Sequence, residues 1–285
     1  MLEAAAYNAA MSASLLGVDF TCAPSRRKPL TVAIGRFEPP RLELVELIEL
    51  TTLADFEALL RRPGPWFGAF DFPFGLPREF VDAQGLGTHC DAVIAALHRR
   101  CPTRLAFRAL VDAWGNARPA GQRLIHRATD RAGAAASTSP LQTRYVPVGF
   151  MYYEGLARLV AADLTLPGLR RGDPARVAVE GYPGRLAFEL IGRRSYKNSD
   201  AADRTAARRT MLAALEAGRT RLGIAVTISK AQRRELVDDP GGDRIDALLC
   251  LVQAAWASLQ PDAGVPAGVD AVEGWIVGPS ASSGQ

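Results

Sequence analysis

Histidine and cysteine are scarce in this chain of 285 residues, which contains three histidines and four cysteines. The cysteines are scattered, without a Cys-x-x-Cys pair or a nearby histidine cluster, so the sequence indicates neither a zinc site nor a redox motif. So few histidines also argue against a histidine-rich metal centre or a catalytic triad. Unpaired cysteines are typical of a reducing compartment, which predicts a cytoplasmic protein.

Long apolar runs are absent as well. No stretch approaches the roughly 18 to 20 uninterrupted apolar residues that a membrane span needs. The first sixteen residues lack the basic region and the apolar core of a signal peptide. We therefore expect a soluble protein with no membrane association. The sequence carries no indication of its oligomeric state.

Apolar residues and arginine are abundant. With 48% hydrophobic and 22% charged residues, the chain can bury a full-sized core, either as two average domains or as one α/β domain with a large insertion. Arginine supplies 31 of the 34 basic residues, and the formal net charge is +4. Arginine clamps phosphate well, but a GC-rich genome is the simpler explanation for this bias. The charge thus permits an anionic partner without requiring one.

Hydrophobic periodicity predicts a mixed α/β domain over residues 15–279, with an N-terminal extension (1–14) and a flexible tail (280–285). The predicted order begins with three strands, a helix and a fourth strand, and a helical insertion at about 78–170 separates the fourth strand from the fifth. The strands are expected at 15–20, 30–37, 41–50, 66–72 and 176–182, with a last short strand at 272–277. Helices are expected at 52–60, from 88, and at 104–114, 122–131, 148–164, 186–192, 201–218, 230–239 and 245–256.

Acidic residues occur where several of these strands end. Asp19 ends an apolar strand, Asp71 lies inside another between two phenylalanines, and Glu180 closes a third. A carboxylate beside buried apolar strands is costly unless it is paired or bound to a cation. Open α/β sheets place ligand sites at the carboxyl ends of their strands. The three acids are therefore expected to converge on one crevice.

Two more acids, Asp243 and Asp246, begin the strongly periodic helix near the C-terminus. Their spacing of three residues puts both on one side of its first turn. Clustered carboxylates repel one another, and magnesium, which prefers oxygen ligands, relieves that repulsion. Each acid also has a structural interpretation: Asp243 as a helix N-cap, Asp19 and Asp71 as turn residues, and Glu180 as the partner of an arginine. The conjunction of all five favours a functional site.

Several motifs occur in an order that resembles the domain-of-unknown-function family "four-two-nine". They are Gly17-Val18-Asp19, the segment Asp71 to Pro77 (DFPFGLP), Glu180-Gly181-Tyr182-Pro183, Lys197, Asp243 to Ala247 (DRIDA) and Glu273 to Ile276 (EGWI). Members of that family are predicted RNase H-like nucleases similar to the RuvC and YqgF groups.

The resemblance implies an RNase H-like fold, which is a five-stranded sheet with an antiparallel second strand, flanked by helices. It also implies that Asp19, Asp71, Asp243 and Asp246 bind Mg²⁺ or Mn²⁺. Glu180 matches a glutamate of the family, and Lys197 is assigned to phosphate contact or leaving-group stabilisation. An ordinary surface lysine is the alternative for Lys197.

Arginine stripes suggest where a phosphate backbone would lie. Arg104 and Arg108 are one helical turn apart, Arg123 and Arg127 continue toward Arg131 with the same spacing, and Arg26 belongs to a basic turn after the first strand. A solvated helix face explains such stripes more often than substrate binding does.

Together these features predict a magnesium-dependent nuclease that hydrolyses phosphodiester bonds in DNA or RNA by a two-metal mechanism. Two alternatives stay open. The related actin-like ATPases share this sheet, although the turn after Asp19 lacks a glycine-rich phosphate loop. A non-catalytic nucleic-acid-binding protein with an acidic pocket is the other.

Overall fold

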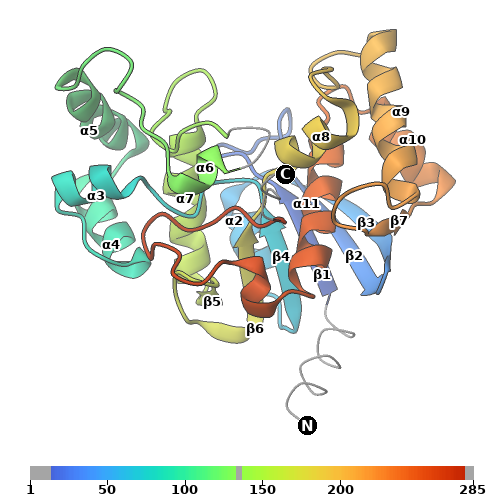
Figure 1. Ribbon diagram of the computed structural model, residues 1–285, viewed down its shortest axis with the longest axis horizontal. Helices are drawn as coiled ribbons and strands as arrows, with labels where there is room; N and C mark the ends of the chain where they lie inside the picture. The colour runs from blue at the N-terminus through green and yellow to red at the C-terminus, as the bar shows by residue number, and fades with distance from the viewer. Residues whose placement is uncertain (1–13, 133–136, 280–285) are drawn as a thin grey trace, which may run out of the picture.

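The computed structural model describes residues 14–132 and 137–279, which form a mixed α/β fold around one seven-stranded sheet (Figure 1). The strand order is β5-β6-β4-β1-β2-β3-β7. The strands are β1 (Ser14–Asp19), β2 (Leu30–Glu38), β3 (Arg41–Leu50), β4 (Trp66–Phe70), β5 (Leu164–Thr165), β6 (Asp173–Glu180) and β7 (Ala225–Thr227). Strands β1, β4 and β6 are parallel to one another, and β2 is antiparallel to both of its neighbours.

The sheet confirms the α/β prediction but has seven strands, whereas the family resemblance implies five. The two additional strands, β5 and β7, lie at the edges and contain two and three residues, too few to produce a periodic pattern. The predicted strand at 272–277 is wrong, because only an isolated bridge between Ile276 and Glu180 forms there. The predicted N-terminal extension and C-terminal tail lie outside the described residues, apart from Ser14.

Helices flank both faces of the sheet (Figure 1). They are α2 (Leu53–Leu60), α3 (Arg78–Gln84), α4 (Cys90–Arg100), α5 (Arg104–Asn116), α6 (Ala128–Arg131), α7 (Val148–Ala161), α8 (Pro183–Ile191), α9 (Ala202–Glu216), α10 (Lys230–Asp238), α11 (Asp243–Ala257) and the 3₁₀ helix η1 (Pro261–Gly264). Of the described helices, none is long and apolar enough to cross a membrane.

The helix predictions hold except over 122–131. Thr52 caps α2 through a capping box with Asp55, as the spacing predicts. Only Ala128–Arg131 is helical in the segment where a longer helix was expected. An i, i+4 stripe of arginines therefore does not exist there, because residues 122–127 are not helical.

Helix α11 packs directly across β1, and a glycine makes this contact possible. An ideal Cβ at Gly17 would lie 2.1 Å from the carbonyl oxygen of Ala247 and 2.2 Å from the nitrogen of Leu251. Any side chain at Gly17 would therefore push the helix away. The close approach brings the first turn of α11 over the carboxyl end of β1.

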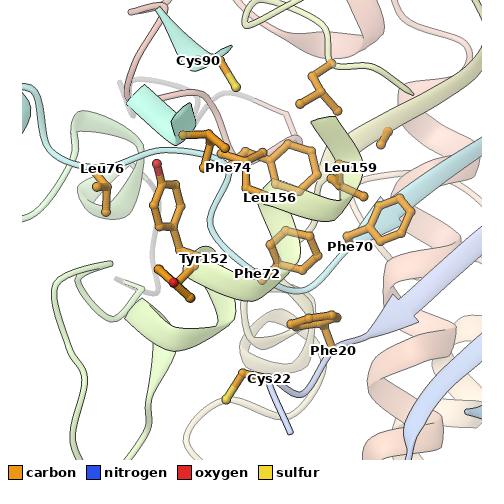
Figure 2. Close-up of a cluster of buried hydrophobic side chains, with 14 of the residues drawn as sticks. Phe20, Cys22, Phe70, Phe72, Phe74, Leu76, Cys90, Tyr152, Leu156 and Leu159 are labelled. Atoms are coloured by element: carbon orange, nitrogen blue, oxygen red, sulfur yellow. The ribbon is translucent and has the colours of Figure 1, made fainter. Parts of the chain in front are cut away.

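A cluster of aromatic rings fixes the chain just after β4 on the other face of the sheet (Figure 2). The ring of Phe72 lies 4.7 Å from that of Phe20 and 5.2 Å from that of Phe74, measured between centroids. Phe72 also packs on α7, where a Cβ at Gly155 would come within 2.6 Å of its ring. The turn that begins at Asp71 is therefore anchored in the core.

Candidate metal centre

Asp19 and Asp71 leave two neighbouring parallel strands at the same edge. Asp19 is the last residue of β1, and Asp71 follows directly after β4. Val18 pairs with Phe70 in the sheet, and the Asp71 amide donates to the Val18 carbonyl oxygen at 2.9 Å. Asp71 is thus just beyond its strand, not inside it as predicted, because Phe72 leaves the sheet to join the aromatic cluster.

Helix α11 brings a third carboxylate to this edge. Asp246, in its first turn, is 1% exposed, while Asp19 and Asp71 are half-buried. One oxygen from each of Asp19, Asp71 and Asp246 lies within 4.8 Å of the others. The prediction that these acids converge is confirmed for these three, which we call the acid cluster.

Burial and mutual repulsion act against ionisation in the acid cluster. Desolvation, followed by the charges of Asp71 and Asp243, raises the pKa of Asp19 well above its usual value. Desolvation also raises the pKa of Asp71 to about 6, against the attraction of Lys197. A cation with oxygen ligands would relieve both effects, so the donor set fits a divalent ion such as Mg²⁺.

Asp246 already has two partners. The Tyr196 hydroxyl donates to its Oδ1 at 2.5 Å, and the Lys197 ammonium contacts its Oδ2. Gly242 allows this arrangement, because its φ of 77° is left-handed and an ideal Cβ there would lie 2.9 Å from Lys197 Cγ. Sequence reasoning singled out Lys197 but missed Tyr196, although the tyrosine directly precedes it.

Asp243 is close to the acid cluster without being one of its three members. It is the first residue of α11, and the N-cap is Gly242, so its interpretation as an N-cap is wrong. Its Oδ2 lies beside Gly241, 3.3 Å from the position that a Cβ would take there. Its charge nevertheless contributes to the raised pKa of Asp19 and of Asp71.

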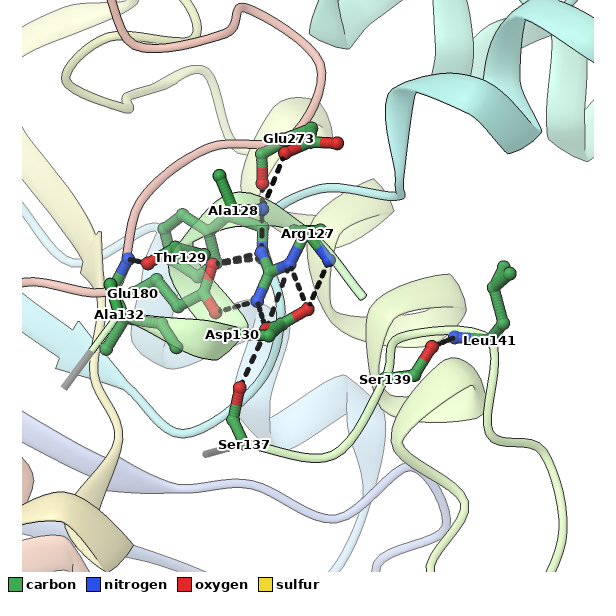
Figure 3. Close-up of polar contacts among 12 residues, drawn as sticks. Arg127, Ala128, Thr129, Asp130, Ala132, Ser137, Ser139, Leu141, Glu180 and Glu273 are labelled. Atoms are coloured by element: carbon green, nitrogen blue, oxygen red, sulfur yellow. Dashed lines mark hydrogen bonds and ion pairs between the residues drawn. The ribbon is translucent and has the colours of Figure 1, made fainter. Parts of the chain in front are cut away.

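Glu180 forms a buried ion pair instead of joining the acid cluster (Figure 3). Arg127, 1% exposed, donates to both of its carboxylate oxygens at 2.6 and 2.8 Å and also pairs with Asp130 at 2.8 Å. The Phe74 amide donates to Glu180 at 2.8 Å. The interpretation of Glu180 as the partner of an arginine is confirmed, and Arg127 is that arginine. The roles of Glu180 as a catalytic acid and of Arg127 as a substrate contact stay predictions.

Comparison with known families gives one match. Residues 17–270 match the family described as "Protein of unknown function (DUF429)". The chain belongs to this family. No curated protein has a significant sequence match to the chain.

Two of the other arginines predicted to bind substrate in this DUF429 chain contact other parts of the protein. Arg104 donates to the Cys22 carbonyl oxygen at 3.1 Å and pairs with Glu154 at 3.3 Å. Arg108 donates to the Thr143 carbonyl oxygen at 2.8 Å, and its guanidinium lies 4.7 Å from the centre of the Phe150 ring. Both therefore have structural partners.

Two predicted arginines are exposed. Arg26 lies between β1 and β2, and Arg123 lies in an irregular segment before α6. The structure leaves both side chains accessible to a substrate.

A cavity of about 340 Å³ adjoins the acid cluster. Asp71, Asp246 and Lys197 form one side of it, and Met151 of α7 lies in its lining. Sequence reasoning missed this cavity, because its walls come from segments far apart in the chain.

Proposed function

We propose that this chain is a divalent-cation-dependent nuclease with an RNase H-like fold. The acid cluster carries the proposal. Asp19, Asp71 and Asp246 come from two strands and a helix, yet their oxygens lie within 4.8 Å of one another. A structural role alone would not require three carboxylates to share one buried edge at such an electrostatic cost.

The sheet topology supports the fold part of the proposal. Without its two short edge strands, the sheet has the order β3-β2-β1-β4-β6, with β2 antiparallel. The family resemblance implies a five-stranded sheet of this kind, with acids at the first strand, at the fourth strand and on the final helix. Asp19, Asp71 and Asp246 occupy those three places.

The side chains of the acid cluster suit the chemistry of phosphodiester hydrolysis. A divalent cation, when bound, would lower the pKa of a water molecule and offset charge on the phosphate. Asp19, Asp71 and Asp246 would hold that cation, and Asp243, whose charge raises the pKa of Asp19 and of Asp71, would contribute to a second ligand set. Lys197 would leave Asp246 and contact a phosphate oxygen, since its side chain is 35% exposed.

The test is hydrolysis of end-labelled DNA and RNA of varied structure, with Mg²⁺ or Mn²⁺ and with a chelator. We expect cleavage that needs the cation and that Asp71→Asn and Asp246→Asn abolish. Asp112→Asn is the matched control, because this half-buried carboxylate lies outside the acid cluster and pairs only with Arg144 among the described contacts. Metal-independent cleavage, or full activity of both cluster variants, would contradict the proposal.

Two further outcomes identify the alternatives. Nucleic-acid binding that is unchanged in the cluster variants, without cleavage of any substrate, would indicate a binding protein. An increase in thermal stability with ATP would point instead to a nucleotide-handling protein of the actin-like type.

A further inference from the structure

The cavity beside the acid cluster has the size of a small-ligand site. Its volume of about 340 Å³ lies at the lower end of the range of roughly 300–1,000 Å³ that such sites span. Asp71 and Asp246 belong both to the acid cluster and to the cavity lining. A group in the cavity would therefore be directly next to a phosphate held at the acids.

The walls of the cavity combine apolar and hydroxyl-bearing side chains. Phe72, Val148 and Met151 supply apolar surface, and Ser137 and Thr138 supply hydroxyls. The Ser137 hydroxyl donates to Asp130 at 2.7 Å, so its oxygen is left as an acceptor. A nucleobase needs this combination, because its faces pack on apolar groups and its edge forms hydrogen bonds.

One apolar residue of the cavity lining is exposed, and so is the residue that precedes it in the chain. Val146 lines the cavity and is 60% exposed, and the adjacent Tyr145 is 99% exposed. Tyr145 has a φ of 59°, a left-handed conformation that is uncommon outside glycine and asparagine. An exposed aromatic residue thus directly precedes a lining residue of the cavity in the chain, and its ring offers a surface on which a base can stack.

From these observations we propose that the cavity accepts one unstacked nucleoside of the substrate, with its phosphate at the acid cluster. The proposal rests on the proposed nuclease function and specifies its substrate class. A base inside a duplex must lose its pairing and stacking before it can enter the cavity, so the preferred substrates are strand ends, bulges and single strands. Extrusion of a base costs least where it is already unpaired.

The test measures binding separately from cleavage. Asp19→Asn prevents cleavage without changing a residue of the cavity lining. The probes are oligonucleotides with 2-aminopurine at a strand end, in a bulge or inside a full duplex. We expect tighter binding of the end and bulge probes than of the duplex probe, and a change in 2-aminopurine fluorescence on binding for the end and bulge probes only.

Cavity variants in the same background locate the bound base. Met151→Trp fills the cavity and should weaken binding of the end and bulge probes about ten-fold, the size of one lost base-stacking contact. Tyr145→Ala should weaken it by a similar factor, and Tyr145→Phe should restore it. Leu259→Trp is the control, because Leu259 is 42% exposed at the other end of α11 and outside the cavity lining.

A measurement on the unaltered protein covers the case in which Met151→Trp does not fold. A nucleoside 5′-monophosphate should compete with the end probe, and a ribose phosphate without a base should not. The proposal would be overturned by equal binding of the duplex and end probes, or by equal competition from the nucleoside monophosphate and the ribose phosphate.

The two proposals fail in different ways. If the protein cleaves inside a full duplex and Met151→Trp cleaves equally well, the nuclease proposal stands and the nucleoside-cavity proposal is rejected. Base-dependent binding without any cleavage by the unaltered protein would retain the cavity and reject the nuclease.

Discussion

At the residue scale, the surroundings of the Asp71 carboxylate disfavour its ionised form. Its pKa is raised from 3.8 to about 6, first by desolvation and then by the charges of Glu180 and Asp243. A folded-state pKa above the unfolded value means that the folded protein binds the proton more tightly. The associated stability is complete below about pH 4 and is lost as the pH rises through 6.

Asp71→Asn should therefore stabilise the protein at pH 8 in the presence of a chelator. The expected gain is about 1–3 kcal/mol in the free energy of unfolding, with little or no gain at pH 4. Urea unfolding across this pH range measures it, with Asp112→Asn as control. Added Mg²⁺ should stabilise the unaltered protein more than the variant. A variant that is less stable than the unaltered protein at pH 8 with chelator would contradict this prediction.

Lys197 provides a second prediction at this scale. Its ammonium contacts Asp246 and lowers the pKa of Asp19 and of Asp71. The lysine therefore partly neutralises the acid cluster, as a bound metal ion would. Lys197→Met should bind Mn²⁺ several-fold more tightly at pH 8, because the ion no longer competes with a positive charge worth about 1 kcal/mol. Calorimetric titration measures the affinity, and Lys230→Met is the control. Weaker binding by Lys197→Met would show that the lysine does not compete with the ion.

The three members of the acid cluster could be predicted from the sequence, but the residues that surround the cluster could not. Asp19, Asp71 and Asp246 were predictable because strand ends and a helix start have local signatures. The pairing of Glu180 with Arg127 was not, since the two residues are 53 positions apart and any of the arginines could have served. Tyr196 and the cavity also depend on tertiary contacts that no local pattern encodes.

At the element scale, the position of α11 on β1 sets the geometry of the acid cluster. Gly17→Ala would place a methyl group against the backbone of Ala247 and Leu251, so the helix must shift. We expect a loss of about 2–3 kcal/mol in stability, together with a marked loss of Mn²⁺ affinity, because Asp246 moves with the helix. Denaturation and metal titration test this.

Gly115→Ala is a matched control for that substitution. A Cβ at Gly115, in α5, would meet only ordinary contacts at 3.4 Å from Arg123. Its stability should be unchanged or slightly higher, since alanine favours a helix. Equal stability of Gly17→Ala and Gly115→Ala would refute the importance of the β1–α11 contact.

Element boundaries followed local rules where those rules were strong. The three-stranded start of the sheet and the capping box of α2 were predicted from alternation and spacing. The helix expected over 122–131 does not form in full. Arg127 contacts Glu180 and the carbonyl oxygen of Glu273, and the Ala128 amide donates to the Glu273 carboxylate, so these contacts fix an irregular path before Ala128. Tertiary ion pairing outweighed helix propensity there.

At the scale of the whole molecule, Arg127 joins three distant parts of the chain. It contacts Asp130 in the segment between β4 and β6, Glu180 at the end of β6, and the carbonyl oxygen of Glu273 near the C-terminus (Figure 3). Arg127→Met leaves two buried carboxylates without a counter-charge. We expect a loss of about 3–5 kcal/mol, measured by chemical denaturation.

Arg123→Met is the control for Arg127, since its side chain is exposed only four residues away. Its stability should stay within about 0.5 kcal/mol of the unaltered protein. An equal loss of stability in both variants would contradict the prediction that the ion pairs of Arg127 stabilise the fold.

The central claim is that Asp19, Asp71 and Asp246 share one divalent cation. Anomalous diffraction from crystals soaked in Mn²⁺ tests it most directly. We expect a peak about 2–2.3 Å from an oxygen of each of the three carboxylates, with the Lys197 ammonium displaced from Asp246. A fully soaked crystal with Mn²⁺ bound elsewhere, no peak among these acids and Lys197 still on Asp246 would contradict it.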